Sequence, residues 1–480
     1  MRLMENSMNN NDEKTISAIS TAYGEGGIGI VRMSGAESFR ILCKIFRTPF
    51  KDGDNSDFDN SIKLDEIKNR HLYYGNVVDP VSKRIVDEVL VVFMKGPATY
   101  TKEDVCEIYC HGSVVSLGRI LELTFDMGAV PASPGEFTKR AFLNGRIDLS
   151  QAEAVIDIIK AKSDVGFELA IDQLEGSVSK KISQLTDQIL NVVATIVVDI
   201  DYPDEDAADV KAIELREQLL NIKEQIDGLV KTADSGRMIK DGINTVIAGK
   251  PNVGKSSLMN ELLREARSIV TEIPGTTRDT IEEVVNLNGI PVKLTDTAGI
   301  RDTDDKIEKI GIQKTKEAFN NADLIIFMLD GQSGIDDLDR DIGSKIGERK
   351  CFAVINKTDL GRNMSDNQIH ELVPEATIIE MSVVNGLGLE KVEQGITELV
   401  FAGELKQENS LVVTGARHKN LLKQASKEME EAMNMIDIGE ALDFVHVNVN
   451  QALEYLGEIT GESVTEDILH KVFSQFCVGK

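Results

Sequence analysis

The segment Gly249–Ser257 constrains the fold of this chain more than any other, because it matches the pattern G-x-x-x-x-G-K-[ST]. A β-branched run precedes it at 244–248, and apolar side chains recur at helical spacing over 257–263. A glycine-rich turn between a buried strand and a helix directs backbone N–H groups around a phosphate, at the positive end of the helix dipole. The sequence therefore predicts a nucleotide-binding loop in which Lys255 contacts the β- and γ-phosphates and Ser256 ligates Mg²⁺.

Two further motifs follow in the order that GTPases require. The D-x-x-G motif Asp296–Gly299 comes after the strand-like run 291–295, and the N-K-x-D motif Asn356–Asp359 comes after the run 351–355. The first predicts an aspartate that holds a Mg²⁺-bound water and a glycine N–H that binds the γ-phosphate. The second ends in a carboxylate that accepts two N–H bonds from guanine, whereas adenine would leave this charge unpaired. Together the motifs predict GTP binding.

The residue that orients the attacking water is not the usual one. Ile300 stands directly after the D-x-x-G motif, where many small GTPases carry a glutamine, and an aliphatic side chain cannot position water. Glu308 is the candidate for this task, although from composition alone a solvated surface glutamate is the simpler interpretation. Thr277 is the candidate second Mg²⁺ ligand. Positive charge on the transferred phosphoryl group would come from Arg278 or Arg301, or from a monovalent cation.

Length and composition leave room for several folded domains and no membrane span. A chain of 480 residues, 41% hydrophobic, supports about two to four domains with full cores. No apolar run is long enough for a transmembrane helix, and residues 1–12 are polar and lack a signal-peptide core, which predicts a cytoplasmic protein. The net charge of −27 argues against non-specific nucleic-acid binding but leaves room for a local basic patch.

The cysteines and the acidic residues each have a structural interpretation. Cys106 and Cys110 lie four residues apart in a strand-like stretch, with His111 beside the second, so a metal site is one alternative. We interpret them as reduced core thiols on one face of a strand. The acidic cluster around Pro203, over residues 199–209, predicts a solvated loop between two helices.

The chain is organised as an α/β module placed between helical segments. Residues 15–147 mix β-rich runs with short helical stretches, which predicts an α+β domain. Helical periodicity then covers 150–234 and returns after about 408, with Ser150 as the expected N-cap and Glu153 as its capping-box partner. The alternation of strands and helices between these segments predicts a doubly covered, parallel-rich sheet inserted into one helical domain. The predicted boundaries are 1–147, 148–240, 241–403 and 404–480.

Three further motifs, outside the GTPase motifs, resemble those of one particular protein family. They are Gly26–Gly35, Ser133–Leu149 and the ending Phe476–Lys480, which contains C-x-G-K. Over essentially its whole length the chain resembles the tRNA-modification GTPase family MnmE, also called TrmE. The resemblance implies an N-terminal folate-binding domain that forms a homodimer, a helical domain, and an inserted Ras-like P-loop G domain.

Several site residues follow from the resemblance, position by position. It implies that a 5-formyltetrahydrofolate-type ligand contacts Arg32, Glu107, Arg146 and Lys480, where Arg146 replaces the lysine of some relatives. It implies that K⁺ stimulates hydrolysis, that Glu308 positions the water, and that two G domains meet across the nucleotides. The implied K⁺ ligands are Asn252, Thr271, Ile273 and Thr276, and the implied Mg²⁺ ligands are Ser256 and Thr277. The full set predicted to bind GTP is Asn252, Val253, Gly254, Lys255, Ser256, Ser257, Thr271, Glu272, Ile273, Pro274, Gly275, Thr276, Thr277, Asp296, Thr297, Ala298, Gly299, Asn356, Lys357, Thr358, Asp359, Ser382 and Val383.

The implied reaction goes beyond hydrolysis. With an FAD-dependent partner, MnmG (GidA), in a heterotetramer-type complex, the family forms a carboxymethylaminomethyl-type group at the wobble uridine of certain tRNAs. Cys477 is either a modification thiol or a structural one. The guanine loop departs from the family pattern at Ser382–Val384, a change we expect to be tolerated because backbone N–H groups make its contacts. The alternatives are a ribosome-assembly switch GTPase without covalent chemistry and a folate enzyme with a regulatory G domain.

Overall fold

The structure, a computed structural model, describes residues 14–48, 61–202, 208–265, 283–296, 317–401 and 411–480. It forms two compact units, each described by itself below. The first comprises Met1–Ile156, Gln173–Thr186 and Glu454–Lys480, and the second comprises Asp157–Asp172 and Asp187–Leu453. No helix in the described ranges is long and apolar enough to cross a membrane.

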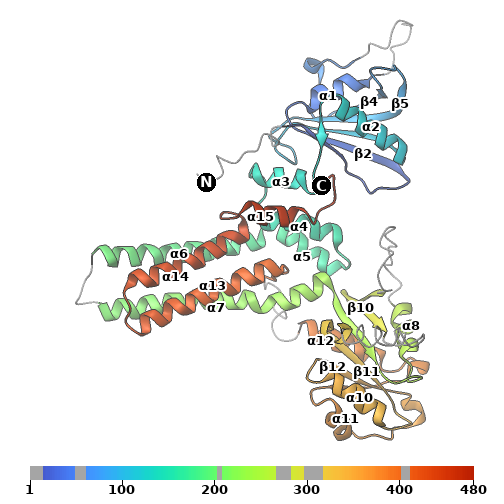
Figure 1. The fold of residues 1–480 in the computed structure, drawn as a ribbon, viewed down its shortest axis with the longest axis vertical. Helices are drawn as coiled ribbons and strands as arrows, with labels where there is room; N and C mark the ends of the chain where they lie inside the picture. The colour runs from blue at the N-terminus through green and yellow to red at the C-terminus, as the bar shows by residue number, and fades with distance from the viewer. Residues whose placement is uncertain (1–13, 49–60, 203–207, 266–282, 297–316, 402–410) are drawn as a thin grey trace, which may run out of the picture. The chain divides into compact units, whose positions relative to one another are not determined.

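The first unit contains a mixed sheet with strand order β3-β4-β5-β6-β2-β1-β7, covered by two helices (Figure 1). All neighbouring strands are antiparallel except β1 and β7. The alternating residues Val31 and Met33 of β2 face the core together with Ile41 and Leu42 of the first helix. The elements are β1 (Ile16–Ile19), β2 (Gly26–Ser34), α1 (Ser38–Ile45), β3 (Phe46–Arg47), η1 (Leu64–Glu66), β4 (Leu72–Val78), β5 (Ile85–Met94), β6 (Val105–Gly112), α2 (Val114–Asp126) and β7 (Val130–Pro131). The predicted α+β architecture is confirmed.

Cys106 and Cys110 are buried on β6 and form no disulfide, as the strand interpretation predicts. Burial raises the pKa of Cys110 to about 11 and that of Cys106 well above its ordinary value. Both thiols therefore stay protonated near neutral pH and act as small core side chains.

The C-terminal tail is fastened inside the first unit, beside β1 and the start of α3 (Glu136–Leu143). The Gly135 N–H donates to the Cys477 carbonyl at 3.4 Å, and Ser20 Oγ donates to the Gly479 carbonyl at 3.0 Å. Gly479 has φ +95°, and a Cβ there would lie 2.0 Å from the Ile19 carbonyl. Only glycine fits this close approach, which places Lys480 next to the end of β1.

The helical segments are α4 (Leu149–Lys160), α5 (Asp164–Leu174), α6 (Ser177–Asp201), α7 (Ala208–Asp241), α13 (Ala416–Asp437), α14 (Leu442–Thr460) and α15 (Glu466–Phe473). The predicted N-cap of α4 was wrong. Asp148 Oδ1 accepts the Gln151 N–H at 2.9 Å, and Gln151 Oε1 accepts the Asp148 N–H at 3.0 Å, so the capping box starts two residues earlier. Leu149 is fully buried against Phe473, which fixes the start of the helix there and leaves Ser150 inside it.

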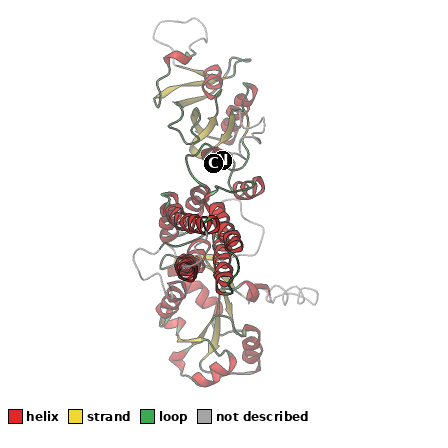
Figure 2. Ribbon diagram, turned by 90° about the vertical axis from the view of Figure 1, so that its left-hand side faces the viewer, coloured by secondary structure: helices red, strands yellow, loops and turns green. Residues whose placement is uncertain are grey.

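The second unit contains a sheet with order β13-β12-β11-β8-β10-β9, parallel except for β9, with helices on both faces (Figure 2). Along β11, alternate residues enter opposite cores, as Ile326 and Phe327 do, which explains its unbroken apolar run. The elements are β8 (Ile243–Ala248), α8 (Lys255–Glu265), β9 (Glu283–Leu287), β10 (Ile290–Asp296), β11 (Leu324–Asp330), α10 (Asp337–Ile346), β12 (Cys351–Asn356), η4 (Thr358–Leu360), α11 (Asp366–Leu372), β13 (Thr377–Glu380), η5 (Val383–Asn385) and α12 (Leu389–Phe401).

This sheet is inserted into the helical part of the chain. α7 ends at Asp241 and β8 begins at Ile243, while α13, after the sheet, packs along α7. The returning chain approaches α7 at Gly236, where a Cβ would lie 2.1 Å from the Val413 carbonyl. The predicted inserted α/β fold is confirmed, and the four domain boundaries stay predictions.

Candidate functional site

The phosphate loop Gly249–Ser257 comprises the turn after β8 and the first residues of α8. Gly249 and Gly254 have φ +150° and +105°, and a Cβ on Gly249 would lie 2.5 Å from the Met328 carbonyl. The Lys255 ammonium donates to the carbonyls of Gly249 (3.0 Å) and Lys250 (2.9 Å), so the loop itself holds the side chain. Ser256 is exposed in the first turn of α8. This geometry suits a phosphate bound at the helix N-terminus.

Lys250 anchors this loop to the start of α10, a contact that no sequence motif predicts. Its Nζ lies 2.8 Å from Asp336 Oδ2 and 3.0 Å from Asp339 Oδ2, the two residues of the α10 capping box. Burial acts to lower the pKa of Lys250, but these hydrogen bonds outweigh it and raise the pKa above its ordinary value. The position is variable in G-x-x-x-x-G-K, so no local pattern marks it.

Asn356 joins the phosphate loop to the guanine loops. Its Nδ2 donates to the Val253 carbonyl at 2.8 Å, and its Oδ1 accepts the Val383 N–H at 3.1 Å. The residue is 4% exposed. The first residue of N-K-x-D is therefore a structural bridge between three loops that belong to the predicted GTP site.

Asp359, the predicted guanine-reading carboxylate, is exposed and already oriented. Ser382 Oγ donates to its Oδ1 at 2.7 Å. Beside it, Lys357 lies at φ +63° and pairs with Asp330 at 2.7 Å. Burial acts to raise the pKa of Asp330, but hydrogen bonds from Lys357 and two backbone N–H groups hold it below its ordinary value. In the loop Ser382–Val384, whose sequence differs from the family pattern, the Val384 side chain is 90% exposed and therefore does not crowd its neighbours.

We expect Asn356→Ala to weaken GTP and GDP binding together, by roughly 10- to 100-fold, because the buried Val253 carbonyl and the half-buried Val383 N–H each lose a partner. Titration with fluorescent analogues of both nucleotides measures this. Asn385→Ala, on the exposed end of η5, is the matched control and should bind like the wild type. Unchanged affinity in Asn356→Ala would contradict the bridging role.

Part of the predicted GTP and cation site lies outside the described residues: Thr271, Glu272, Ile273, Pro274, Gly275, Thr276, Thr277, Thr297, Ala298, Gly299 and Glu308. Arg278, Ile300 and Arg301 also lie outside them. Asp296 ends β10 and pairs in register with Ile247 of β8, so its backbone lies at the sheet edge from which the phosphate loop starts. Asn252 is exposed in the loop at φ +63°.

Two of the predicted folate residues are in direct contact in the first unit. Arg32 of β2 and Glu107 of β6 are register partners, and Arg32 Nε lies 2.8 Å from Glu107 Oε1. Tyr109 OH donates to the other carboxylate oxygen at 2.6 Å, and burial together with this bond raises the pKa of Tyr109 to about 12. The Arg32 guanidinium also lies over the Phe137 ring of α3, 5.7 Å from its centroid.

The other two predicted folate residues lie around the same helix. The Arg146 guanidinium stacks 4.6 Å from the centroid of the Tyr100 ring, and Tyr100 OH is hydrogen-bonded to Thr138 of α3 at 2.9 Å. Lys480 follows Gly479, whose segment is tied to the start of α3 through Cys477. The Cys477 side chain itself is exposed. α3 therefore links all four positions, with cationic groups and one carboxylate on the same unit.

Comparisons with known proteins match these parts of the chain. Residues 15–146 match the family model described as GTP-binding protein TrmE N-terminus, and residues 149–477 match that described as MnmE helical domain. Three relatives are each called tRNA modification GTPase MnmE, and in each case the match covers 99% of the relative's length. Those of Alkaliphilus metalliredigens and Clostridioides difficile are 48% and 47% identical over 98% of this chain. That of Thermoanaerobacter pseudethanolicus is 48% identical over 97% of it.

Proposed function

Because this chain belongs to the MnmE family of tRNA modification GTPases, we propose that it couples K⁺-stimulated GTP hydrolysis to modification of the wobble uridine in certain tRNAs. As a family member it is a GTP hydrolase that acts in tRNA modification. The observation that carries the proposal is identity of 48% over 98% of the chain and 99% of the relative, a match that extends far beyond the G domain. A shared G domain alone would leave the purpose of hydrolysis open.

The proposed product is a carboxymethylaminomethyl-type group, formed by a homodimer of this chain with an FAD-dependent MnmG-type partner. A 5-formyltetrahydrofolate-type ligand would supply the one-carbon unit. The residues around α3 suit such a ligand, because Arg32, Arg146 and Lys480 offer cations for its carboxylates. Glu107 accepts from Arg32 and Tyr109 and retains lone pairs for pterin N–H groups.

In the G domain we propose that K⁺ provides the positive charge that an arginine finger supplies elsewhere. The exposed Asn252 amide suits it, because its oxygen is a hard, neutral ligand and the φ of +63° turns the residue out of the loop. Glu308 is proposed to orient the attacking water in place of the absent glutamine. Ser256 and Thr277 are proposed to ligate Mg²⁺.

We expect GTP hydrolysis in KCl to exceed that in NaCl by at least about tenfold, because the cation replaces a group worth much more than this in related enzymes. Asn252→Ala should lose the difference and keep its affinity for GDP. Asn260→Ala, an exposed asparagine on α8, should behave as the wild type. Equal rates in both salts, or full K⁺ stimulation in Asn252→Ala, would remove the cation from the proposal.

The chemistry as a whole is tested by reconstitution. The purified chain, the FAD-dependent partner with a reductant for its flavin, folate, glycine, GTP and unmodified tRNA are combined in KCl, and the wobble nucleoside is analysed by mass spectrometry. The proposal predicts a mass increase at C5 of that uridine that requires both proteins and folate. Hydrolysis without any change in the tRNA would favour the alternative, a switch GTPase without covalent chemistry.

A further inference from the structure

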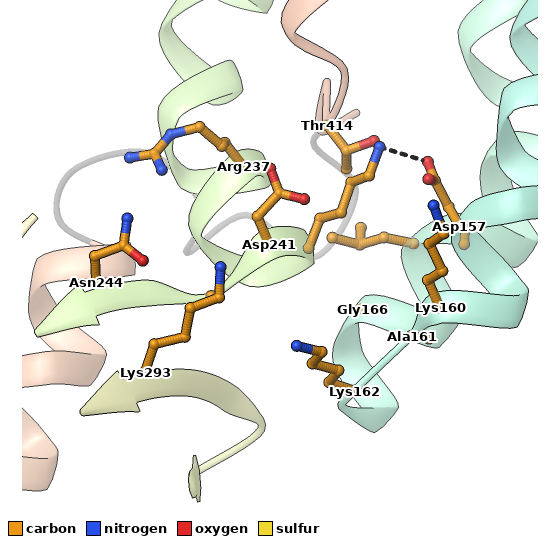
Figure 3. Close-up of a pocket in the computed structure, with 14 residues that line it drawn as sticks. Asp157, Lys160, Ala161, Lys162, Gly166, Arg237, Asp241, Asn244, Lys293 and Thr414 are labelled. Atoms are coloured by element: carbon orange, nitrogen blue, oxygen red, sulfur yellow. Dashed lines mark ion pairs between the residues drawn. The ribbon is translucent and has the colours of Figure 1, made fainter. Parts of the chain in front are cut away.

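The second unit contains a basic pocket of about 380 Å³ where α7 ends and β8 begins (Figure 3). Five of its lining residues are basic and two are acidic, and Asp323 neutralises one of the five, which leaves a formal excess of two positive charges. This local sign is opposite to that of the whole chain, whose net charge is −27. The basic residues come from α4 and the turn after it, α7 and β10, and are Lys160, Lys162, Arg237, Lys240 and Lys293.

Two of these cations are held by carboxylates. Arg237 Nη2 lies 2.5 Å from Asp323 Oδ1, and the other oxygen of Asp323 accepts the Asn244 N–H at 3.0 Å. Lys240 Nζ lies 2.9 Å from Asp157, the ion pair drawn in Figure 3. These two ion pairs hold the wall of the pocket in place and are neutral, so the positive charge of the pocket comes from its other lysines.

Lys162 and Lys293 form no ion pair with any described residue. Lys162 is exposed, whereas Lys293 is half-buried on β10, where its register partner Asn244 also lines the pocket. An ammonium group that loses part of its hydration without gaining a carboxylate is stabilised by an anionic ligand. The pocket therefore has the charge and the vacant donors of an anion site.

The two lysines are held in a fixed relation, although more than a hundred residues of sequence separate them. Val165 and Leu169 of α5 pack against the core of the sheet, and Val165 fills the space where a Cβ of Gly289 would stand. Ser163 Oγ accepts the Gly166 N–H at 3.1 Å and shapes the turn that carries Lys162. The turn after α4 and the strand β10 are thereby assembled before any ligand binds.

We propose that this pocket binds a phosphate group of an RNA backbone. The inference rests on tRNA as the substrate of this chain, and it is independent of the folate and K⁺ proposals. Lysines contact phosphates as point charges, and a strongly acidic protein needs a local cluster of them to hold RNA. The volume of about 380 Å³ is large enough for a sugar-phosphate unit. Free phosphate shares this chemistry, so the test separates the two sources.

The test measures binding of tRNA to the full chain by fluorescence anisotropy over a series of salt concentrations. The double variant Lys162→Gln/Lys293→Gln should bind roughly tenfold more weakly, and the magnitude of the slope of log K against log salt should fall by about 1, as expected for the loss of one phosphate contact. Lys350→Gln/Lys391→Gln removes the same charge from exposed positions of the same unit and should stay within about twofold of the wild type. GTP hydrolysis without tRNA should be unchanged in both variants, which verifies folding.

Four results would overturn the proposal. Equal slopes in the wild type and the pocket variant, or equal losses in both double variants, would remove the pocket from RNA binding. A melting temperature that inorganic phosphate raises only in the wild type, with tRNA binding unchanged in the pocket variant, would assign the site to a free phosphate. Absence of tRNA binding in the wild type would count against the tRNA function itself, a separate outcome from failure of the pocket alone.

Discussion

Asp359→Asn is expected to lower the affinity for GTP by roughly 10²–10³-fold and to create binding of xanthosine triphosphate. The carboxylate, oriented by Ser382, accepts two N–H bonds from guanine in the proposed complex. An amide offers one acceptor and one donor group, so it leaves a guanine N–H unpaired. Xanthine carries a carbonyl oxygen where guanine carries its amino group, and that oxygen accepts from the new amide.

Competition titrations with both triphosphates, followed by hydrolysis rates with each, measure this exchange of specificity. Asp337→Asn, at an exposed position in the first turn of α10, removes the same charge and should keep GTP specificity. The assignment of Asp359 fails if the variant binds GTP as the wild type does. Loss of both nucleotides would show instead that the substitution disrupts the loop held by Asn356 and Ser382.

Arg32→Ala is expected to weaken folate binding by roughly 10²-fold or more, with GTP hydrolysis within about twofold of the wild type. The substitution removes a cation proposed to contact the ligand. It also leaves Glu107, whose side chain is 13% exposed, without its ion-pair partner. Both effects act on residues linked through α3, and neither reaches the nucleotide loops through a described contact.

Equilibrium binding of 5-formyltetrahydrofolate measures this effect, with the melting temperature as the check on folding. Arg40→Ala is the matched control, because Arg40 is 65% exposed and its pair with Glu37 at 3.2 Å contributes little. Arg32→Lys keeps the charge but loses the planar fork, so it should recover part of the affinity. Wild-type affinity in Arg32→Ala would refute the assignment of the folate site to this face.

The sequence was sufficient where a motif carries its own local geometry. Gly249–Ser257 needs a strand before it and a helix after it, and the structure has β8 and α8 there. The apolar runs of β8 and β11 likewise identify buried strands, because both of their faces enter cores. Contacts between residues distant in sequence could not be predicted. The contact of Lys250 with Asp339 is an example, because no sequence pattern relates residues 89 positions apart.

The misplaced cap of α4 has a related cause. Asp148 and Ser150 are both good N-cap residues, and local chemistry does not rank them. The burial of Leu149 against Phe473, from the other end of the chain, decides the start of the helix. The sequence could not predict the basic pocket for the same reason, because only the packing of α5 on the sheet brings Lys162 and Lys293 to the same pocket.

The central claim is that this chain acts in the modification of wobble uridines. Mass spectrometry of the nucleosides at the wobble position, in tRNA from cells that lack this chain, tests it most directly. The account predicts loss of the carboxymethylaminomethyl-type group from C5 of that uridine, restored by the wild-type chain and not by Asp359→Asn. Wobble uridines that stay fully modified in the absence of the chain would contradict it.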